Sequence, residues 1–290
     1  MNARLDTASI AAKRQRRESR AAMDAEDRIP AIDWQEQPVD CASCNYKALL
    51  EEGRCELAYA CINDRYARRI DRFFRFNPET SNDNLAHPYF EVRSLACKNA
   101  DVFRLPALID DPDETVRLSI AMRLPQRLLQ RMKDDEYREV RIRVAARLDP
   151  EYLPGMIRDV DYHVRALVAR RLPLALLATM VNDRDEQVRC EVAERIDMPA
   201  LLMLVADRTL EVRRIVARRL PVGLLDRLAG DVEWLVRWEV AQRAGPALLA
   251  RLAEDEDEEV RSAARSRLAE AAAAAAGVSH DSHGKEQNHG

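Results

Sequence analysis

The chain has 290 residues, of which 47% are hydrophobic and 33% charged, so it can bury the core of one large or two modest domains. A formal net charge of -4 gives no field that would draw the whole molecule to nucleic acid or anionic lipid. No stretch reaches the roughly 18 apolar residues of a membrane span, and the N-terminus lacks the apolar core of a signal peptide. We therefore expect a cytoplasmic protein that is not bound to a membrane.

The first predicted segment, residues 1–37, carries mixed charges, and we expect a flexible arm there. A cysteine-rich domain follows over residues 38–90. Four of the six cysteines are grouped within 21 residues in a C-x2-C-x10-C-x5-C pattern, at Cys41, Cys44, Cys55 and Cys61. In a reducing compartment grouped thiols indicate metal binding rather than disulfides.

Four thiolates complete a tetrahedral sulfur site, which suits either structural zinc or an iron–sulfur cluster. The spacing of Cys41, Cys44, Cys55 and Cys61 matches neither the common zinc pattern nor the common ferredoxin patterns. The residues alone therefore leave zinc and an iron–sulfur cluster equally open.

A basic and aromatic segment follows the last of these cysteines. It contains Arg65, Arg69 and Arg72 together with Phe73, Phe74 and Phe76. We interpret it as an amphipathic helix whose aromatic side chains pack on the next domain. Two alternatives are that its cations stabilise an anionic metal site, or that it binds single-stranded nucleic acid.

The next segment, residues 91–268, has an internal repeat. A Val-Arg dipeptide recurs every 24 residues without insertion or deletion, beginning at Val92, Val116, Val140, Val164, Val188, Val212, Val236 and Val260. A fixed period of this size indicates a stacked-repeat architecture.

With this Val as position 1 of the repeat, positions 1, 5 and 9 are mostly apolar, which is the spacing of one face of an α-helix. Pro follows at about position 10 in several repeats, as at Pro173 and Pro221, and ends the helix. If the first helix takes roughly 12 residues, only about six remain for the second element, so we predict a short 3₁₀ helix.

Two polar residues recur with the same period. Asp occupies position 20 in seven loops, from Asp111 to Asp255. We expect each Asp to be a helix N-cap or a loop brace that pairs with the Arg at position 2, the alternative being a ligand group. Arg at position 8, such as Arg171, is expected to lie over the apolar stripe. All but five of the 46 basic residues are Arg, which reflects either genome composition or a structural need for guanidinium groups.

The two remaining cysteines fall inside the repeats. Cys97 occupies the small position 6 and is expected in the core, whereas Cys190 is expected to be a lone, more exposed thiol. Neither is a predicted metal ligand.

Taken together, the repeat V-R-x-x-V-A-x-R-L followed by P and L-L, as in residues 164–177, and the grouped cysteines resemble one family. It is the bacterial leucine-rich repeat variant proteins with an N-terminal iron–sulfur domain. The resemblance covers about residues 39–268. It implies one 4Fe–4S cluster on Cys41, Cys44, Cys55 and Cys61 as ligands, with zinc as the alternative, and an association with nitrogen fixation. It also implies an all-α fold: a right-handed superhelical solenoid of eight 24-residue repeats with alternating α and short 3₁₀ helices, after a small helical iron–sulfur domain.

No phosphate-binding loop, nucleotide motif or Ser/His/Asp constellation is present in the sequence, so we do not expect an enzyme. Solenoids offer long surfaces for protein partners. Apolar residues at positions 3 and 4, such as Leu118, Ile215 and Trp238, are expected to be exposed, which favours a protein partner over nucleic acid.

We therefore expect an interaction scaffold with a redox- or iron-sensitive cap. The alternatives are an electron-transfer protein and a solenoid that binds nucleic acid through an Arg-lined face. A repeat array leaves an apolar face at each end. We expect the cysteine-rich domain to cover the N-terminal face, and residues 269–290 to form a disordered Ala-rich tail.

Overall fold

The fold is seen in a computed structural model that describes residues 29–281, with side chains to residue 273. The chain divides into two compact units, Met1–Met132 and Lys133–Gly290, called unit 1 and unit 2 below. Within the described residues there is no strand, and the only β-type pairs are two isolated bridges, Ile32–Pro38 and Glu56–Ala60. None of the helices in this part of the chain is both long and apolar enough to cross a bilayer.

Unit 1 contains the cysteine domain, defined here as residues 29–84, and the first two repeats. Its helices are α2 (Lys47–Glu51), α3 (Ala67–Phe76), η1 (Pro78–Asn84), α4 (Phe90–Ala96), η2 (Leu105–Leu108), α5 (Glu114–Ala121), α6 (Gln126–Leu129) and η3 (Gln130–Met132).

Residues 29–37, which the sequence analysis assigned to a flexible arm, contact the rest of the cysteine domain in the structure. The guanidinium of Arg69 donates to the carbonyl oxygen of Ile29 at 2.6 Å, and the indole of Trp34 packs on two rings beyond η1. Arg69 binds main-chain carbonyl oxygens of this stretch, and because every residue has such a carbonyl, these contacts cannot be predicted from the sequence. Residues 1–28 of the expected arm lie outside the described residues.

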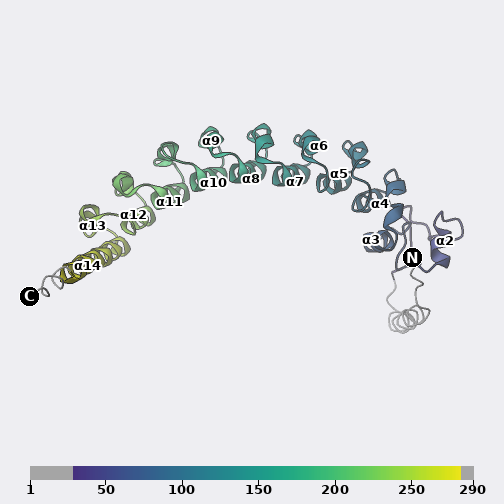
Figure 1. The fold of residues 1–290 in the computed structure, drawn as a ribbon, viewed down its shortest axis with the longest axis horizontal. Coiled ribbons are helices and arrows are strands. Elements are labelled where there is room, and N and C mark those ends of the chain that lie inside the picture. Colours follow the sequence, from purple (N-terminus) through teal and green to yellow (C-terminus); the bar gives the residue numbers. More distant parts are fainter. Residues whose placement is uncertain (1–28, 282–290) are drawn as a thin grey trace, which may run out of the picture. The chain divides into compact units, whose positions relative to one another are not determined.

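Unit 2 contains the later repeats. Its helices are α7 (Arg138–Arg147), η4 (Pro150–Met156), α8 (Tyr162–Arg171), α9 (Leu174–Leu177), η5 (Ala178–Met180), α10 (Glu186–Arg195), η6 (Ala200–Leu204), α11 (Leu210–Arg219), η7 (Val222–Leu228), α12 (Trp234–Ala241), α13 (Pro246–Leu252) and α14 (Glu258–Asp281). The longer helices lie side by side in one layer, and the short helices form a second layer beside them (Figure 1).

The repeat that starts at Val164 shows why the two layers form. Val164, Val168 and Leu172 lie on one face of α8 and are fully buried, as is Leu177 from the following short helix. Leu172 has an extended ψ of 143° and Pro173 follows it, so the helix ends after 10 residues, fewer than the 12 expected. The predicted alternation of α-helices with short 3₁₀ helices is confirmed, although several of the short elements also contain an α turn.

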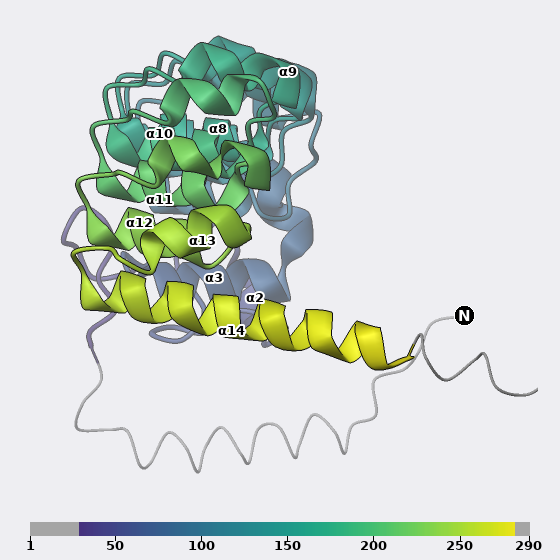
Figure 2. The same cartoon turned by 90° about the vertical axis from the view of Figure 1, so that its left-hand side faces the viewer.

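Helix α14 is much longer than its counterparts and spans 24 residues. A disordered tail was expected from residue 269, whereas the structure continues the helix to Asp281, because no Pro ends it and Ala is the strongest helix former. Figure 2 shows α14 running past the helices stacked beside it in unit 2. Residues 282–290 lie outside the described part of the chain.

Six of the arginines at position 2 form a two-bonded ion pair with the Asp 18 residues later. In one such pair, Arg165 Nε and Nη2 donate to the two carboxylate oxygens of Asp183 at 2.8 and 2.9 Å. The side chains are 4% and 9% exposed. Burial alone would raise the pKa of Asp183, but the hydrogen bond from Arg165 holds that pKa below its ordinary value. The same pairing joins Arg93 to Asp111, Arg141 to Asp159, Arg189 to Asp207, Arg213 to Asp231 and Arg237 to Asp255.

The Asp at position 20 is a loop brace and not a helix cap. Asp183 Oδ1 accepts the main-chain N–H of Asp185, and Asp185, two residues later, is the N-cap that accepts from Gln187. Arg189 of the following helix also donates to the Asp183 carbonyl at 2.9 Å. One Asp thus joins two consecutive repeats, which fixes their stacking register.

The Arg at position 8 contacts the preceding repeat. Arg219 Nη1 donates to the carbonyl oxygens of Ala193 and Ile196, at 2.6 and 2.7 Å, at the C-terminal end of α10. The last carbonyl oxygens of a helix have no hydrogen-bond partner within that helix. A cation at this end also interacts favourably with the negative end of the helix dipole. Equivalent bonds are made by Arg123, Arg171, Arg195 and Arg243. At both repeat positions the bonds use the planar guanidinium with its several N–H donors, which Lys does not offer.

Arg219→Met is expected to lower the free energy of unfolding by about 1.5–3 kcal/mol, because two carbonyls lose a charged donor. The neighbouring Arg218 is the matched control, since its side chain is 41% exposed and makes only long ion pairs. Arg218→Met should change stability by less than about 0.5 kcal/mol. Urea denaturation of the two variants measures the difference, and equal effects would contradict the capping role of Arg219.

The apolar side chains at positions 3 and 4 are not exposed, contrary to the expectation. Ile215 is 3% exposed, and Leu118 and Trp238 are half-buried, because helices of adjacent repeats pack closely. In unit 2 the exposed apolar side chains lie elsewhere, and three of them occupy position 11 of consecutive repeats: Leu174, Met198 and Val222.

Candidate metal centre

The four grouped cysteines lie on loops around α2 and before α3. Cys41 and Cys44 precede α2, and Cys55 and Cys61 follow it. The chain reverses after α2 at Gly53, whose φ of +68° is readily adopted only by glycine. The main-chain N–H of Cys55 then donates back to Leu49 of α2 at 3.1 Å. This reversal returns the second pair of cysteines toward the first.

The four thiols are near enough to affect one another's protonation. Burial, and then the negative charges of Cys61 and Cys44, raise the pKa of Cys41. A hydrogen bond with Cys61 lowers the pKa of Cys55 and raises that of Cys61. The pKa effects therefore link the four thiols electrostatically, while their role as ligands stays a prediction.

Two N–H groups point at the sulfur of Cys44. The main-chain N–H of Tyr46 lies 3.4 Å from Sγ, and the side-chain amide of Asn63 lies 3.3 Å from it. The main-chain N–H of Asn63 also donates to the sulfur of Cys61, which lowers the pKa of that thiol against the larger raising effects of Cys55 and burial. Asn63 was not predicted from the sequence; its place two residues after a grouped cysteine was the only available signal.

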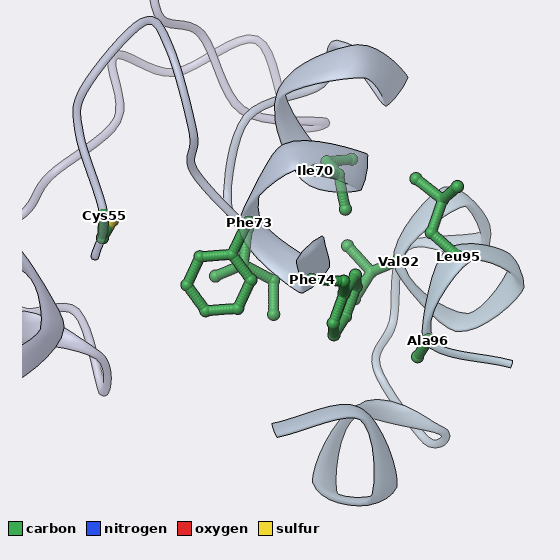
Figure 3. Close-up of a cluster of buried hydrophobic side chains, with 8 residues drawn as sticks. Cys55, Ile70, Phe73, Phe74, Val92, Leu95 and Ala96 are labelled. Carbon is green, nitrogen blue, oxygen red and sulfur yellow. The ribbon is translucent and has the colours of Figure 1, made fainter. Parts of the chain in front are cut away.

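The cysteine domain shares a core with the first repeat. Cys55, Ile62, Ile70, Phe73 and Phe74 form one buried cluster with Val92, Leu95 and Ala96. Figure 3 shows Ile70 and Phe74 of α3 directed toward Val92 of α4. The expected packing of the aromatic segment is confirmed for Phe73 and Phe74, whereas Phe76 is 40% exposed. Cys55 thus belongs both to the grouped thiols and to the core that covers the first repeat.

Several arginines of the basic segment are paired within unit 1. Arg69 forms a buried ion pair with Asp64 at 2.7 Å, and Arg65 pairs with Glu36 at 2.6 Å. The guanidinium of Arg72 lies 4.5 Å from the ring centre of Tyr59. This pairing favours a structural role for the segment over nucleic-acid binding.

The other two cysteines stand apart from the group. Cys97, the C-cap residue of α4, is fully buried, and burial raises its pKa to about 12. Cys190 on α10 is half-buried, and burial raises its pKa to about 11. Both thiols are therefore protonated at neutral pH and poorly reactive, in agreement with the sequence analysis.

The donor set suits a metal centre bound by four thiolates. Within residues 29–281, no three His, Cys, Asp or Glu side chains already stand at mutual distances that would close around a metal ion. The cysteine loops nevertheless supply four mutually interacting thiols, and two N–H groups that stabilise negative charge on sulfur. Both features fit an iron–sulfur cluster.

The fold and the site together define a class: a helical protein of 24-residue repeats with an N-terminal domain of grouped thiols. A family model described as "LRV protein FeS4 cluster" matches residues 31–83, and one described as "Leucine rich repeat variant" matches residues 210–233. The chain is 42% identical to a solved structure described as a leucine-rich repeat variant with a novel repetitive protein structural motif. The two agree with a TM-score of 0.74, and the match covers 79% of this chain and 99% of that one. The chain belongs to the leucine-rich repeat variant family, and its N-terminal domain is of the iron–sulfur type.

A curated relative from Rhodobacter capsulatus is also similar. It is named "Uncharacterized 27.7 kDa protein in nifB 3'region" and is 51% identical over 94 residues. The match covers 32% of this chain and 38% of the relative, so the chain spans less than two fifths of that protein's length.

Proposed function

We propose that the chain is a non-catalytic scaffold that binds a protein partner on its repeats and carries one 4Fe–4S cluster on Cys41, Cys44, Cys55 and Cys61. The mutual interaction of these thiols and the match of residues 31–83 to the iron–sulfur model support the cluster. When bound, such a cluster supplies a one-electron redox centre and a covalent cross-link between loops. Structural zinc is the alternative that metal analysis would detect.

An uncharged strip of exposed residues on unit 2 supports the scaffold proposal. Positions 11 and 12 of four consecutive repeats hold no charged residue and are exposed: Leu174-Ala175, Met198-Pro199, Val222-Gly223 and Pro246-Ala247. Leu174, Met198 and Val222 are 48%, 40% and 52% exposed, in a chain with 33% charged residues. Exposed apolar residues that recur at one repeat position are typical of protein–protein contact sites.

The repeat arginines favour a protein partner over nucleic acid. An Arg-lined face needs free guanidinium groups to contact phosphates. In this chain six of the arginines at position 2 are paired with Asp, and several at position 8 bind carbonyl oxygens, as Arg165 and Arg219 illustrate. Their charges are therefore largely neutralised or directed inward.

A role connected with nitrogen fixation is part of the proposal. It is supported by the family resemblance and by the name of the R. capsulatus relative, which locates that protein in the nifB 3′ region. Comparing protein levels in cells grown with and without fixed nitrogen tests this connection. Equal levels under both conditions would argue against it.

The strip is tested by a charge-introducing double variant, Met198→Glu with Val222→Glu. We expect a loss of partner affinity of about tenfold or more, because two apolar side chains would no longer be buried at the interface. The matched control is Val160→Glu with Val232→Glu, which changes two exposed valines of unit 2 at positions outside the strip.

Pull-downs from native cells should identify proteins that the wild type and the control retain and the strip variant loses. Binding of the purified candidate then gives the affinity ratio, with the cluster intact and after oxidation. A strip variant that retains every protein bound by the wild type would contradict the proposed docking surface.

A further inference from the structure

Asn63 contacts one of the four grouped cysteines and influences a second. Its side-chain amide donates to Cys44 Sγ at 3.3 Å. Its main chain lowers the pKa of Cys61, against the larger raising effects of Cys55 and burial.

Buried neighbours hold Asn63 in this position. The next residue, Asp64, is fully buried, and its Oδ2 accepts from Arg69 Nη1 at 2.7 Å. Asp64 Oδ1 also accepts the main-chain N–H of Tyr66 at 2.9 Å, which fixes the turn into α3. Since breaking a buried ion pair is costly, the backbone at Asn63 has little freedom to move away from the sulfurs.

The Cys44 side of the site is polar and open. A cavity of about 430 Å³ is lined by Cys44, Tyr46, Ile62, Asn63, Asn84 and His87, among others. The main-chain N–H of Tyr46 is the second donor to Cys44, and the Tyr46 hydroxyl accepts from Asn84 at 2.6 Å. Cys44 therefore has both directed N–H groups and polar space beside it, whereas Cys55 lies in the apolar core.

Hydrogen bonds to cluster sulfurs favour the reduced form, because reduction adds negative charge that the N–H dipoles stabilise. We propose that Asn63 is a positioning residue that raises the reduction potential of the cluster through its hydrogen bond to Cys44. This inference rests on the proposed cluster. The reduction potential describes the equilibrium between the oxidised cluster and the cluster that has gained one electron. Asn63 shifts this equilibrium and is not itself oxidised or reduced.

The test is a potentiometric titration of the whole iron-loaded chain, with dithionite as electron donor and electron paramagnetic resonance as readout. Asn63→Leu removes the amide donor at similar volume and keeps the main-chain N–H. At a fixed potential we expect the ratio of reduced to oxidised cluster to fall about tenfold, which corresponds to about 59 mV for one electron. Asn63→Asp, which replaces the donor with a negative charge, should shift the potential further in the same direction.

Asn45→Leu is the matched control, because Asn45 lines the same cavity and its side chain makes no hydrogen bond to a described cysteine sulfur. Iron content should be the same in all variants. An unchanged potential in Asn63→Leu, an equal shift in Asn45→Leu, or loss of iron from Asn63→Leu would each overturn the inference. A wild-type protein without iron would instead refute the proposed cluster, before any variant is compared.

Discussion

Serine at Cys41, Cys44, Cys55 or Cys61 is expected to remove the cluster, reducing iron from about four atoms per chain to near zero. Serine preserves side-chain volume but offers a poor ligand to iron, and three thiolates do not complete the site. Anaerobically purified wild-type protein should be brown with a broad absorbance near roughly 400 nm, and each serine variant should be colourless. Iron analysis and absorbance measure this directly.

Cys97→Ala and Cys190→Ala are the controls for this result. Both thiols lie outside the group, and burial keeps them protonated. Both variants should keep the iron and the colour of the wild type. One equivalent of zinc with no iron in the wild type, or full iron in any of the four serine variants, would contradict the assignment of the ligands.

Asp183→Ala is expected to lower the free energy of unfolding by about 3–5 kcal/mol, because it leaves the Arg165 guanidinium buried without its carboxylate. The substitution also removes the acceptor for the main-chain N–H of Asp185. The control is Asp226→Ala, since Asp226 is 71% exposed and pairs with an exposed arginine, Arg251. Its effect should stay below about 0.5 kcal/mol.

Denaturant unfolding of the two Asp variants gives the comparison. If Asp183→Ala destabilised the protein no more than Asp226→Ala, the ion pairs would not hold the repeats in register. At a temperature where Asp183→Ala stays folded, partner binding should equal that of the wild type, because Asp183 lies beneath the surface. Loss of binding by the folded variant would make Asp183 part of a binding site.

The repeat architecture could be predicted because it is periodic. The Val at position 1 and the Arg beside it recur at fixed spacing, and a Pro at positions 10 to 12 of most repeats predicts where the helix ends. What the period did not reveal is which groups bond across repeats. Arg219, for example, binds carbonyl oxygens of the preceding helix, and main-chain acceptors are the same at every position of a sequence.

The candidate site could be predicted only as far as its ligand types. Grouped thiols at Cys41, Cys44, Cys55 and Cys61 are visible in the sequence, whereas the orientation of Asn63 depends on the buried pair between Asp64 and Arg69. Arg69 of that pair also donates to the carbonyl oxygen of Ile29, in the stretch where the sequence suggested a flexible arm. Residues placed by tertiary contacts leave no local pattern to read.

The central claim is that the cluster holds the cysteine domain in place as the cover of the first repeat. Cys55 connects the two, since it belongs to the grouped thiols and to the core formed with Val92 and Ala96 (Figure 3). The most direct test is hydrogen exchange on the iron-loaded wild type and on Cys55→Ser. We expect faster exchange in the variant confined to about residues 41–104, with the repeats of unit 2 unchanged. Unchanged exchange in residues 41–104, or a uniform increase as far as residue 268, would contradict it.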